Sequence, residues 1–515
     1  MAGSTMSSVI TFSVYLVVML AMGAWFARKN TELSDFAIGG RRLGTFVATV
    51  SAKATDSSSW VFLGLPGAFY VSGMANIWTS VGLTIGFYVS WRVVAARLRE
   101  HSERGFDFRT GAAAESVTLP AFLANRFHSD LLRVVSSVII LGFYVVYVGS
   151  GFVAAGLMFH QVFGVPTATG VLLGASVVMI YSCLGGFLAT SYTDVVQGCM
   201  MFASLAIVSV VALVSAGGPA AVAESLAARN GNLMSPFVEV ALTDGEWVTG
   251  RSVAVVAILS GLAWGLGYLG QPHILARFMG LRSSSSAKNG RRLGLFLSIT
   301  LLGFAAVIGM LAIVNFGPSL ANPENAYLEM VASLVPPWLA GIFLAGILAA
   351  IMSTADSQLV VAATTLSEDF YRAFVKRNAT ERALVWISRG TVVAVSIVAA
   401  LIALRGGTVL DLVSYAWAGF GAAFGPVILA ALYSRRTTRL GALCGMAAGG
   451  VTVVVYPMVD RIGLYEIIPG FAAGLLGIWL GNRFGPGPHP VATEQFDLVS
   501  TPAGTEHAAA VDSRP

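Results

Sequence analysis

The chain has 515 residues, of which 56% are hydrophobic and only 11% are charged, and its mean hydropathy is +0.77. Soluble domains average about 25% charged residues, so this composition excludes a soluble globular protein and predicts many membrane spans. The formal net charge of +5 is too small to indicate nucleic-acid binding. It fits loops that face the anionic cytoplasmic surface of a membrane.

A helix needs about 20 residues to cross a hydrocarbon core about 30 Å thick. Apolar windows of this length predict an all-α polytopic membrane protein with about 13 transmembrane helices within residues 1–482. In chain order the predicted spans are 8–27, 43–70, 73–98, 130–163, 166–187, 190–217, 249–275, 292–316, 337–370, 382–404, 409–434, 438–458 and 464–482. Residues 483–515 are rich in Pro, Gly, Thr, Glu and Ala, which predicts a disordered tail.

Lysine and arginine are concentrated in alternate loops, which sets the predicted orientation. With the N-terminus outside, the inner loops and the tail hold about 25 basic residues and the outer loops hold about four. Arg277, which follows the span at 249–275, belongs to the predicted inner set. We therefore predict an odd number of spans in the cell membrane, an outside N-terminus and a cytoplasmic C-terminus.

Lys53, Asp56 and Asp356 are charged residues inside predicted spans, and Asp194 lies within a span near its inner end. A charge at the bilayer centre costs about 2.5–3.5 kcal/mol on insertion scales, so each is a functional-site hypothesis. Lys53 and Asp56 belong to the polar stretch Ser-Ala-Lys-Ala-Thr-Asp-Ser-Ser-Ser-Trp at 51–60. These groups are expected to face a protein interior or a watery cavity rather than lipid.

Two spans contain residues that interrupt a helix. The first interruption is 51–60, and the second is Trp-Gly-Leu-Gly-Tyr-Leu-Gly-Gln-Pro-His at 264–273. Interruptions at matching positions of two halves indicate a transporter site built on inverted repeats. Because the two interrupted spans start five spans apart, spans 2–6 and 7–11 are interpreted as a 5+5 inverted repeat. Spans 1, 12 and 13 are additions. Close helix packing would explain one such glycine cluster, but it explains two matched ones less well.

Oxygen-rich positions on two spans suggest an ion site. A broken helix exposes carbonyl groups to a neighbouring helix, and such groups bind the coupling ion in inverted-repeat transporters. Span 2 offers carbonyls near Ala54 and Ser57, and span 9 offers the hydroxyls of Ser353 and Thr354. Hydroxyls in membrane helices more often bond back to the preceding turn, so each residue alone would be weak evidence.

Aromatic residues beside the second interruption suggest a solute site. Trp264 and Tyr268 lie four residues apart and could form one wall, and Tyr147 in span 4 is a third candidate. Each of these rings, taken singly, is more often ordinary core packing. A half-helix end with its positive dipole would suit the carboxylate of a zwitterionic or anionic solute.

Several longer motifs extend these observations over about residues 10–480. They are Gly-Gly-Arg-Arg-Leu-Gly at 39–44, Leu-Gly-Leu-Pro-Gly-Ala at 63–68, Gly-Gly-Phe-Leu-Ala at 185–189 with Thr193 and Asp194, the run at 264–279, Ile-Met-Ser-Thr at 351–354, the run at 412–426, and Leu-Tyr-Glu-Ile-Ile-Pro-Gly at 464–470. In these motifs the chain resembles the solute:sodium symporter family, and within it the bacterial members that carry proline. The resemblance implies a leucine-transporter-like fold that works by alternating access.

The resemblance also implies roles for individual residues. The implied sodium ligands are Ala54, Ser57, Ala350, Ser353 and Thr354. The residues implied in sodium coupling or in the ion path are Asp56, Asp194 and Arg41. The residues implied in substrate binding are Ser58, Tyr147, Trp264, Tyr268 and Pro272.

Lys53 and Asp356 depart from the family pattern, which has glycine and a small hydroxyl residue at these positions. Two unpaired charges would together cost about 5–7 kcal/mol, so we favour an intramembrane ion pair between Lys53 and Asp356 that locks span 2 to span 9. One alternative is that Lys53 pairs with Asp56 three residues on. Another is that the Lys53 ammonium replaces sodium, because buried lysines shift their pKa far.

The expected function is a sodium-coupled secondary active symporter that imports L-proline, with Na⁺ as coupling ion and no other cofactor. The alternatives are proton-coupled or sodium-independent uptake of another small amino acid or carboxylate solute, and more remotely a transporter-like nutrient sensor. The sequence shows no metal-binding His/Glu spacing and no nucleophile motif, so an enzyme is not expected. The expected partners are the solute, Na⁺ and the lipid bilayer, without nucleic acid or an obligate protein partner.

Overall fold

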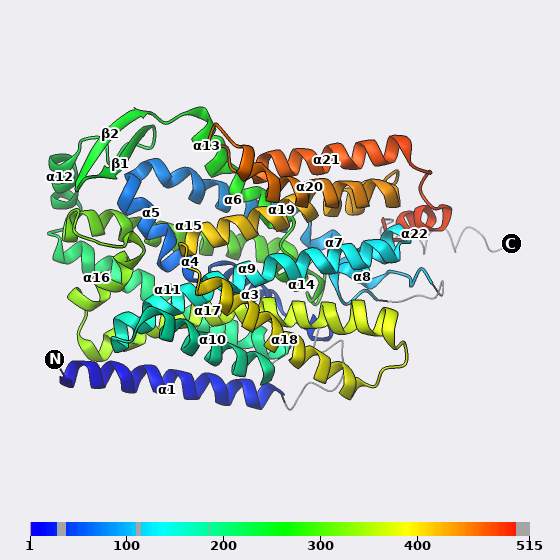
Figure 1. Cartoon of the computed structure of the whole chain (residues 1–515), viewed down its shortest axis with the longest axis horizontal. Helices are drawn as coiled ribbons and strands as arrows, with labels where there is room; N and C mark the ends of the chain where they lie inside the picture. Colours follow the sequence, from blue (N-terminus) through cyan, green and yellow to red (C-terminus); the bar gives the residue numbers. More distant parts are fainter. Residues whose placement is uncertain (1, 28–37, 110–114, 185, 501–515) are drawn as a thin grey trace.

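The computed structural model describes residues 2–27, 38–109, 115–184 and 186–500. Helices run along the long axis of a single bundle (Figure 1). A two-stranded antiparallel hairpin, β1 (Val238–Thr243) and β2 (Glu246–Ser252), lies at one end, which we call the hairpin end. The last helix, α22 (Pro490–Ser500), lies at the opposite tail end. Because α1 begins at the hairpin end, the described chain starts and finishes at opposite ends.

The remaining elements are helical. In chain order they are α1 (Ala2–Ala27), η1 (Gly39–Arg41), α3 (Thr45–Asp56), α4 (Ser59–Phe62), α5 (Gly64–Ser72), η2 (Gly73–Asn76), α6 (Ile77–Val93), α7 (Ala95–Glu103), α8 (Leu119–Phe127), α9 (Asp130–Phe163), α10 (Thr167–Leu184), α11 (Phe187–Ser215), α12 (Pro219–Arg229), α13 (Val255–Ala263), η3 (Trp264–Leu269), α14 (Pro272–Met279), α15 (Ser286–Phe316), η4 (Pro323–Asn325), α16 (Ala326–Leu334), α17 (Pro337–Thr364), η5 (Thr365–Val375), α18 (Glu381–Ala403), α19 (Val409–Tyr433), α20 (Arg439–Val459) and α21 (Ile467–Phe484). Two of the predicted spans are interrupted: the first forms α3, α4 and α5, and the second forms α13, η3 and α14.

This architecture confirms the prediction of an all-α protein with many membrane spans. By length and hydropathy, nine helices among the described residues could cross a bilayer, or ten if the bent pair around 270 counts as one span. Two shorter apolar stretches, Ile10–Met19 and Thr167–Cys183, lie in α1 and α10. The predicted number of thirteen spans therefore stays a prediction.

The tail differs from its prediction. Residues 483–515 were expected to be disordered, but α21 continues to Phe484 and α22 follows at Pro490–Ser500. The α22 helix docks because Phe496 is buried, with the Arg126 guanidinium 4.5 Å from its ring centroid, and because Asp497 pairs with Arg435 at 2.7 Å. The apolar side chains at 492, 496 and 499 recur at helical spacing. Residues 501–515 lie outside the described residues.

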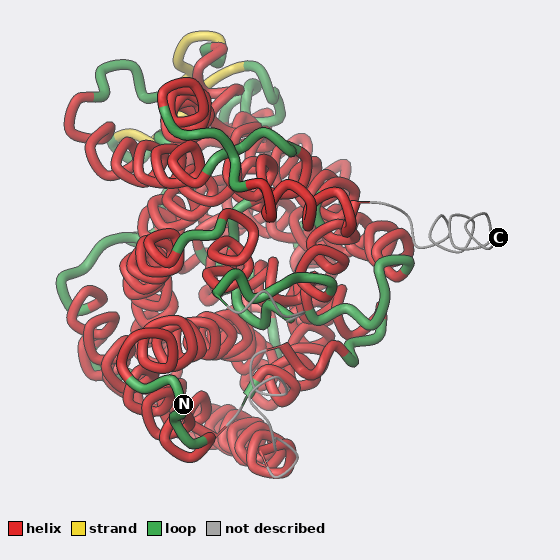
Figure 2. The backbone as a smooth tube through the Cα atoms, turned by 90° about the vertical axis from the view of Figure 1, so that its right-hand side faces the viewer, coloured by secondary structure: helices red, strands yellow, loops and turns green. Residues whose placement is uncertain are grey.

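The α17 helix lies at the centre of the bundle and is buried on every side over most of its length. Every residue from Phe343 to Thr364 is buried, as expected for a helix surrounded by other helices. Figure 2 looks along this bundle from the tail end. The α1, α3, α9 and α11 helices all pack against α17. Polar groups on α17 therefore meet protein rather than lipid.

At the hairpin end, a carboxylate caps the start of α19. Glu324 in η4 is buried, and its two carboxylate oxygens accept hydrogen bonds from the backbone N–H groups of Val409 and Leu410, at 3.0 and 3.1 Å. These N–H groups belong to the first turn of α19, where no carbonyl of the same helix can accept them. Burial raises the pKa of Glu324, and the two amide hydrogen bonds lower it. The loop between α15 and α17 is thereby fastened to α19.

We expect Glu324→Ala to speed amide hydrogen exchange at Val409 and Leu410 by at least about tenfold. The reason is that a hydrogen bond to a charged group contributes about 1.5–3 kcal/mol and about 1.4 kcal/mol is a factor of ten. Exchange followed by mass spectrometry tests this prediction. The matched control is Glu329→Ala on the adjoining α16, whose carboxylate accepts from Gln161 instead. Equal exchange rates in the two variants would contradict the assigned cap.

Candidate functional site

The first interruption is a true break in the helix. The α3 helix ends at Asp56, and Ser57 (φ −83°, ψ 48°) and Ser58 (φ −54°, ψ −168°) leave helical geometry before α4 begins. The hydroxyls of Ser57, Ser58 and Ser59 are buried and have no hydrogen-bond partner among the described residues. Three buried hydroxyls without partners are unfavourable in a closed core. They provide polar groups for a bound ligand.

The helix also breaks at the second interruption, as predicted. The α13 helix passes into the 3₁₀-helix η3 at Trp264, and α14 leaves at an angle of 45°. Gly267 is required here because a Cβ atom would lie 1.8 Å from the indole nitrogen of Trp417. That indole donates a hydrogen bond of 2.8 Å to the Trp264 carbonyl. A carbonyl released by the break is thus satisfied by α19.

The predicted sodium ligands lie where α3 meets α17. Ser353 Oγ donates to the Ala54 carbonyl at 3.2 Å and to the Ala350 carbonyl at 3.1 Å, and Thr354 Oγ1 donates to the Thr55 carbonyl at 2.7 Å. The structure therefore joins Ala54, Ala350 and Ser353 directly. Thr354 is on the same interface through a carbonyl that was not predicted. Ser57 contributes the adjoining break but has no hydrogen bond to α17 among the described contacts.

This group of oxygens suits a monovalent hard cation. The atoms are backbone carbonyls and neutral hydroxyls, and the buried Ser57 hydroxyl beside them has no partner. Broken helices in transporters coordinate Na⁺ with the same kind of oxygens. The residues present therefore fit sodium at the predicted place.

Lys53 pairs with Asp56, so the predicted pair between Lys53 and Asp356 is wrong. The ammonium lies 2.6 Å from Asp56 Oδ2, and both side chains are buried. Tyr268 donates to the same oxygen at 2.6 Å. The physical reason is proximity, because a residue three positions along α3 lies on the same helix face. The shared carboxylate ties the first broken span to the second.

Asp356 lies in a separate part of the core. It is fully buried, and neither of its carboxylate oxygens has a hydrogen-bond partner among the described residues. The charged residues that interact with it electrostatically are Asp194 and Arg277. The structure therefore leaves Asp356 without the cation that the sequence analysis assigned to it.

Arg277 is a candidate site residue that its sequence position did not indicate. It was assigned to an inner loop, but it lies in α14 with 0% side-chain exposure and pairs with Asp194 at 3.0 Å. It also donates to Ser51 Oγ at 3.1 Å and to the Ser357 hydroxyl. Ser51 donates in turn to Asp194 at 2.6 Å. The signal was its place inside the motif at 264–279, one turn after the proline that starts α14.

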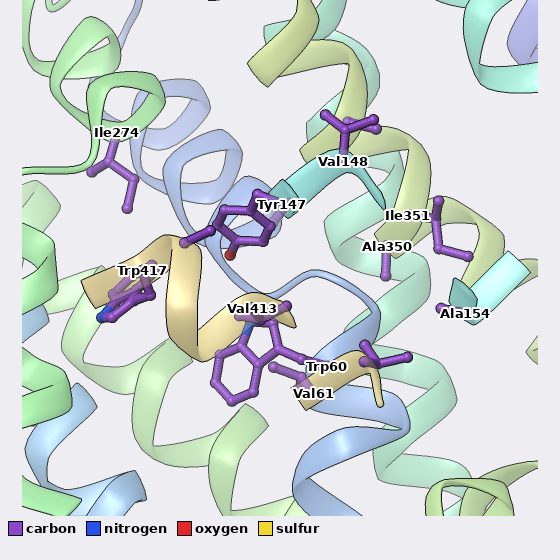
Figure 3. Packing of buried hydrophobic residues seen from close by; sticks show 14 of the residues in the cluster. Trp60, Val61, Tyr147, Val148, Ala154, Ile274, Ala350, Ile351, Val413 and Trp417 are labelled. Atoms are coloured by element: carbon purple, nitrogen blue, oxygen red, sulfur yellow. The ribbon is translucent and has the colours of Figure 1, made fainter. Parts of the chain in front are cut away.

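Only some of the five predicted substrate residues lie close together in the structure. The Trp264 ring lies 6.2 Å from that of Trp60, and the buried Tyr147 hydroxyl points toward the space between Trp60 and Trp417 (Figure 3). Ser58 directly precedes α4, which holds Trp60, and Tyr268 donates to Asp56. Pro272 instead lines a narrow space with residues of α8 and α17. The structure therefore does not join Pro272 to the aromatic group.

Arg41 lies at the tail end, and its guanidinium makes several hydrogen bonds. Its guanidinium donates to Glu115 Oε2 at 2.8 Å, to the Met279 carbonyl at 2.7 Å and to both the hydroxyl and the carbonyl of Ser102. Burial lowers the pKa of Arg41, and the bond to Glu115 raises it. Because Met279 ends α14, Arg41 connects the first loop to the second broken span.

Comparison with known proteins identifies relatives over nearly the whole chain. The family model described as the sodium:solute symporter family matches residues 36–449. The sodium/proline symporter of Escherichia coli (strain K12) is 40% identical over 499 residues, which cover 95% of each chain. The osmoregulated proline transporter OpuE of Bacillus subtilis (strain 168) is 40% identical over 477 residues, covering 91% of this chain and 93% of that protein.

Solved structures share the fold at low sequence identity. A Na⁺-coupled sialic acid symporter in a substrate-bound outward-open state has a TM-score of 0.77 at 18% identity, covering 93% of this chain and 98% of that one. The nucleobase-cation-symport-1 transporter Mhp1 has a TM-score of 0.54 at 13% identity, covering 90% and 98%. These likenesses confirm the predicted leucine-transporter-like fold.

Proposed function

The chain belongs to the sodium:solute symporter family, and on this premise we propose that it imports L-proline together with Na⁺ by alternating access. The proposal draws its substrate from relatives named sodium/proline symporters at about 40% identity. The observation that carries it is the interface where Ser353 and Thr354 donate to carbonyls of the broken first span.

In the proposed mechanism, sodium binds between α3 and α17. Its ligands are the carbonyls of Ala54, Ser57 and Ala350 and the hydroxyls of Ser353 and Thr354. Sodium then takes lone pairs of carbonyl oxygens that now accept hydrogen bonds from Ser353, namely those of Ala54 on α3 and Ala350 on α17. The ion thereby fixes the position of α3 relative to α17.

The solute binds beside the ion at the same break. The hydroxyls of Ser57 and Ser58 have no partner of their own and donate to the proline carboxylate. The rings of Trp264 and Tyr147 enclose the apolar methylene groups of the pyrrolidine ring. Because both ligands use residues on either side of one break, each strengthens the binding of the other by the same factor. The sodium gradient supplies the driving force, with about 2.3 kcal/mol per charge per 100 mV of membrane potential.

Sodium is preferred to the proton or to an internal lysine as the coupling cation. The Lys53 ammonium is held by Asp56 at 2.6 Å and so does not occupy the hydroxyls of α17. Asp56 of α3 joins the second broken span through Tyr268, and Asp194 of α11 links the two broken spans by accepting from both Ser51 and Arg277. These contacts transmit ion binding between the two spans. Arg41 acts on the same second broken span from the tail end.

We place the hairpin end outside the cell and the tail end in the cytoplasm. The basis is the predicted bias of basic residues toward inner loops. The opposite placement of α1's start and α22 (Figure 1) fits an odd number of crossings.

Uptake of radiolabelled proline into proteoliposomes tests the function. An inward sodium gradient is expected to stimulate uptake, and Thr354→Ala is expected to raise the sodium KM about tenfold, as for the loss of about 1.4 kcal/mol. Thr364→Ala is the matched control, since Thr364 lies on α17 but bonds back to Val360. Proline uptake that is independent of the sodium gradient would refute sodium coupling. An absence of proline uptake would refute proline as the substrate.

A further inference from the structure

Tyr465, in the segment before α21, contacts the second broken span in two ways and α19 in a third. Its ring stacks on the Trp264 ring, with centroids 5.2 Å apart and planes 24° apart. Its hydroxyl donates to the Ser414 carbonyl of α19 at 2.7 Å. Its backbone N–H donates to Ser260 Oγ of α13 at 3.0 Å. One residue of the segment before α21 thus contacts α13, η3 and α19.

Trp264 lies between two aromatic rings. Trp60 of α4 lies 6.2 Å away with planes 34° apart, and Tyr465 provides the stacked partner. Trp60 belongs to the first broken span, whereas Tyr465 lies outside the predicted ten-helix repeat. The Trp264 ring therefore keeps its orientation through a residue that the repeat itself does not supply.

We propose that Tyr465 is a positioning residue that sets substrate affinity and selectivity by fixing the Trp264 ring. This inference rests on the proposed solute site. With Tyr465 in place, Trp264 stays as a rigid wall sized for a five-membered ring. Without it, the indole turns toward the space that Tyr465 fills, so the site admits a larger ring and holds proline less tightly.

Two substitutions separate the two contacts of Tyr465. Tyr465→Phe keeps the stacked ring and removes the hydroxyl, and we expect the proline KM to rise about threefold. Tyr465→Ala removes both, and we expect a rise of about tenfold, in line with the usual size of a ring stack and one hydrogen bond. The maximal uptake rate per folded molecule and the sodium KM at saturating proline should stay within about twofold.

The matched control is Tyr433→Phe. Tyr433 ends the same α19, and its hydroxyl donates to the Val93 carbonyl at 2.7 Å, so the same atom is lost from an equally short bond at the tail end. The proline KM of this variant should equal that of the unaltered protein. A general loss of packing would instead lower the maximal rate in Tyr433→Phe and Tyr465→Phe alike.

Selectivity is measured by competition with pipecolate, the six-membered-ring homologue of proline. We expect Tyr465→Ala to shift the pipecolate-to-proline preference about tenfold toward pipecolate, and Tyr465→Phe to shift it less. A readout that needs no substrate is amide exchange in residues 264–269, which should quicken in Tyr465→Ala and stay unchanged in Tyr433→Phe.

The outcomes separate this inference from the proposed function. If the unaltered protein carries proline and Tyr465→Ala keeps its KM and its selectivity, the positioning role is overturned. If the unaltered protein does not carry proline, the proposed function fails, and the exchange readout decides the inference. Faster exchange at 264–269 then supports the fixing of Trp264, and unchanged exchange overturns it.

Discussion

Replacing Arg277 by methionine is expected to reduce sodium-driven uptake to background and to lower the thermal unfolding midpoint of the purified protein. Arg277 is fully buried and is the ion-pair partner of Asp194. Its guanidinium also donates to Ser51 Oγ and to the His273 carbonyl. Breaking a buried ion pair by removing one partner costs about 3–5 kcal/mol. Here the loss leaves Asp194 and Asp356 as two buried carboxylates near each other.

The double variant Arg277→Met with Asp194→Asn separates charge from packing. Because it removes both members of the pair, it should unfold at a higher temperature than Arg277→Met alone. Arg389→Met is the control, since Arg389 is exposed on α18 beside the Trp386 ring and its loss should leave uptake unchanged. Normal uptake by Arg277→Met would show that the buried pair has no part in transport.

Replacing either Lys53 or Asp56 by a neutral residue is expected to abolish sodium-dependent uptake. Lys53→Met leaves Asp56 buried with only the Tyr268 hydroxyl, and Asp56→Asn leaves a buried ammonium beside the Phe87 ring. Each substitution leaves an unpaired charge in the core, which destabilises the folded protein by about 3–5 kcal/mol. Asp56→Asn should have the larger effect on uptake, because it removes the negative charge that both the Lys53 ammonium and the Tyr268 hydroxyl contact.

A comparison of double variants identifies the partner of Lys53. Lys53→Met with Asp56→Asn should be more stable to heat than either single variant, since no charge of the pair remains. Lys53→Met with Asp356→Asn should show no such recovery. The reverse ranking would restore the pair across α3 and α17 that the structure does not form.

The two breaks were predictable because the residue types in each stretch disfavour a continuous helix in a membrane. Charged and hydroxyl side chains at 51–60 and glycines with a proline at 264–273 interrupt an apolar run. The ion-site residues followed from the same pattern joined to the family resemblance. Ala54 and Ser353 proved to be in direct contact, although nearly 300 residues separate them.

The partner of Lys53 and the depth of Arg277 could not be read from the sequence. Hydropathy gives the depth of a residue along a span but not the direction in which its side chain points. The sequence therefore left both Asp56 and Asp356 as possible partners of the Lys53 ammonium. A window of about 20 residues ended the seventh span before Arg277. The 45° bend carries α14 back into the core. The α22 helix was missed because composition outweighed the spacing of Ala492, Phe496 and Val499.

The two buried ion pairs differ in when they become complete during synthesis. Lys53 and Asp56 are three residues apart, so the nascent first broken span carries its own counter-charge as it leaves the ribosome. Asp194 precedes Arg277 by 83 residues, an interval of roughly 4 to 17 s at about 5–20 residues per second. Through that interval α11 holds a carboxylate whose cation has not yet been made. Contact of that carboxylate with lipid is unfavourable until the second broken span brings Arg277 to it.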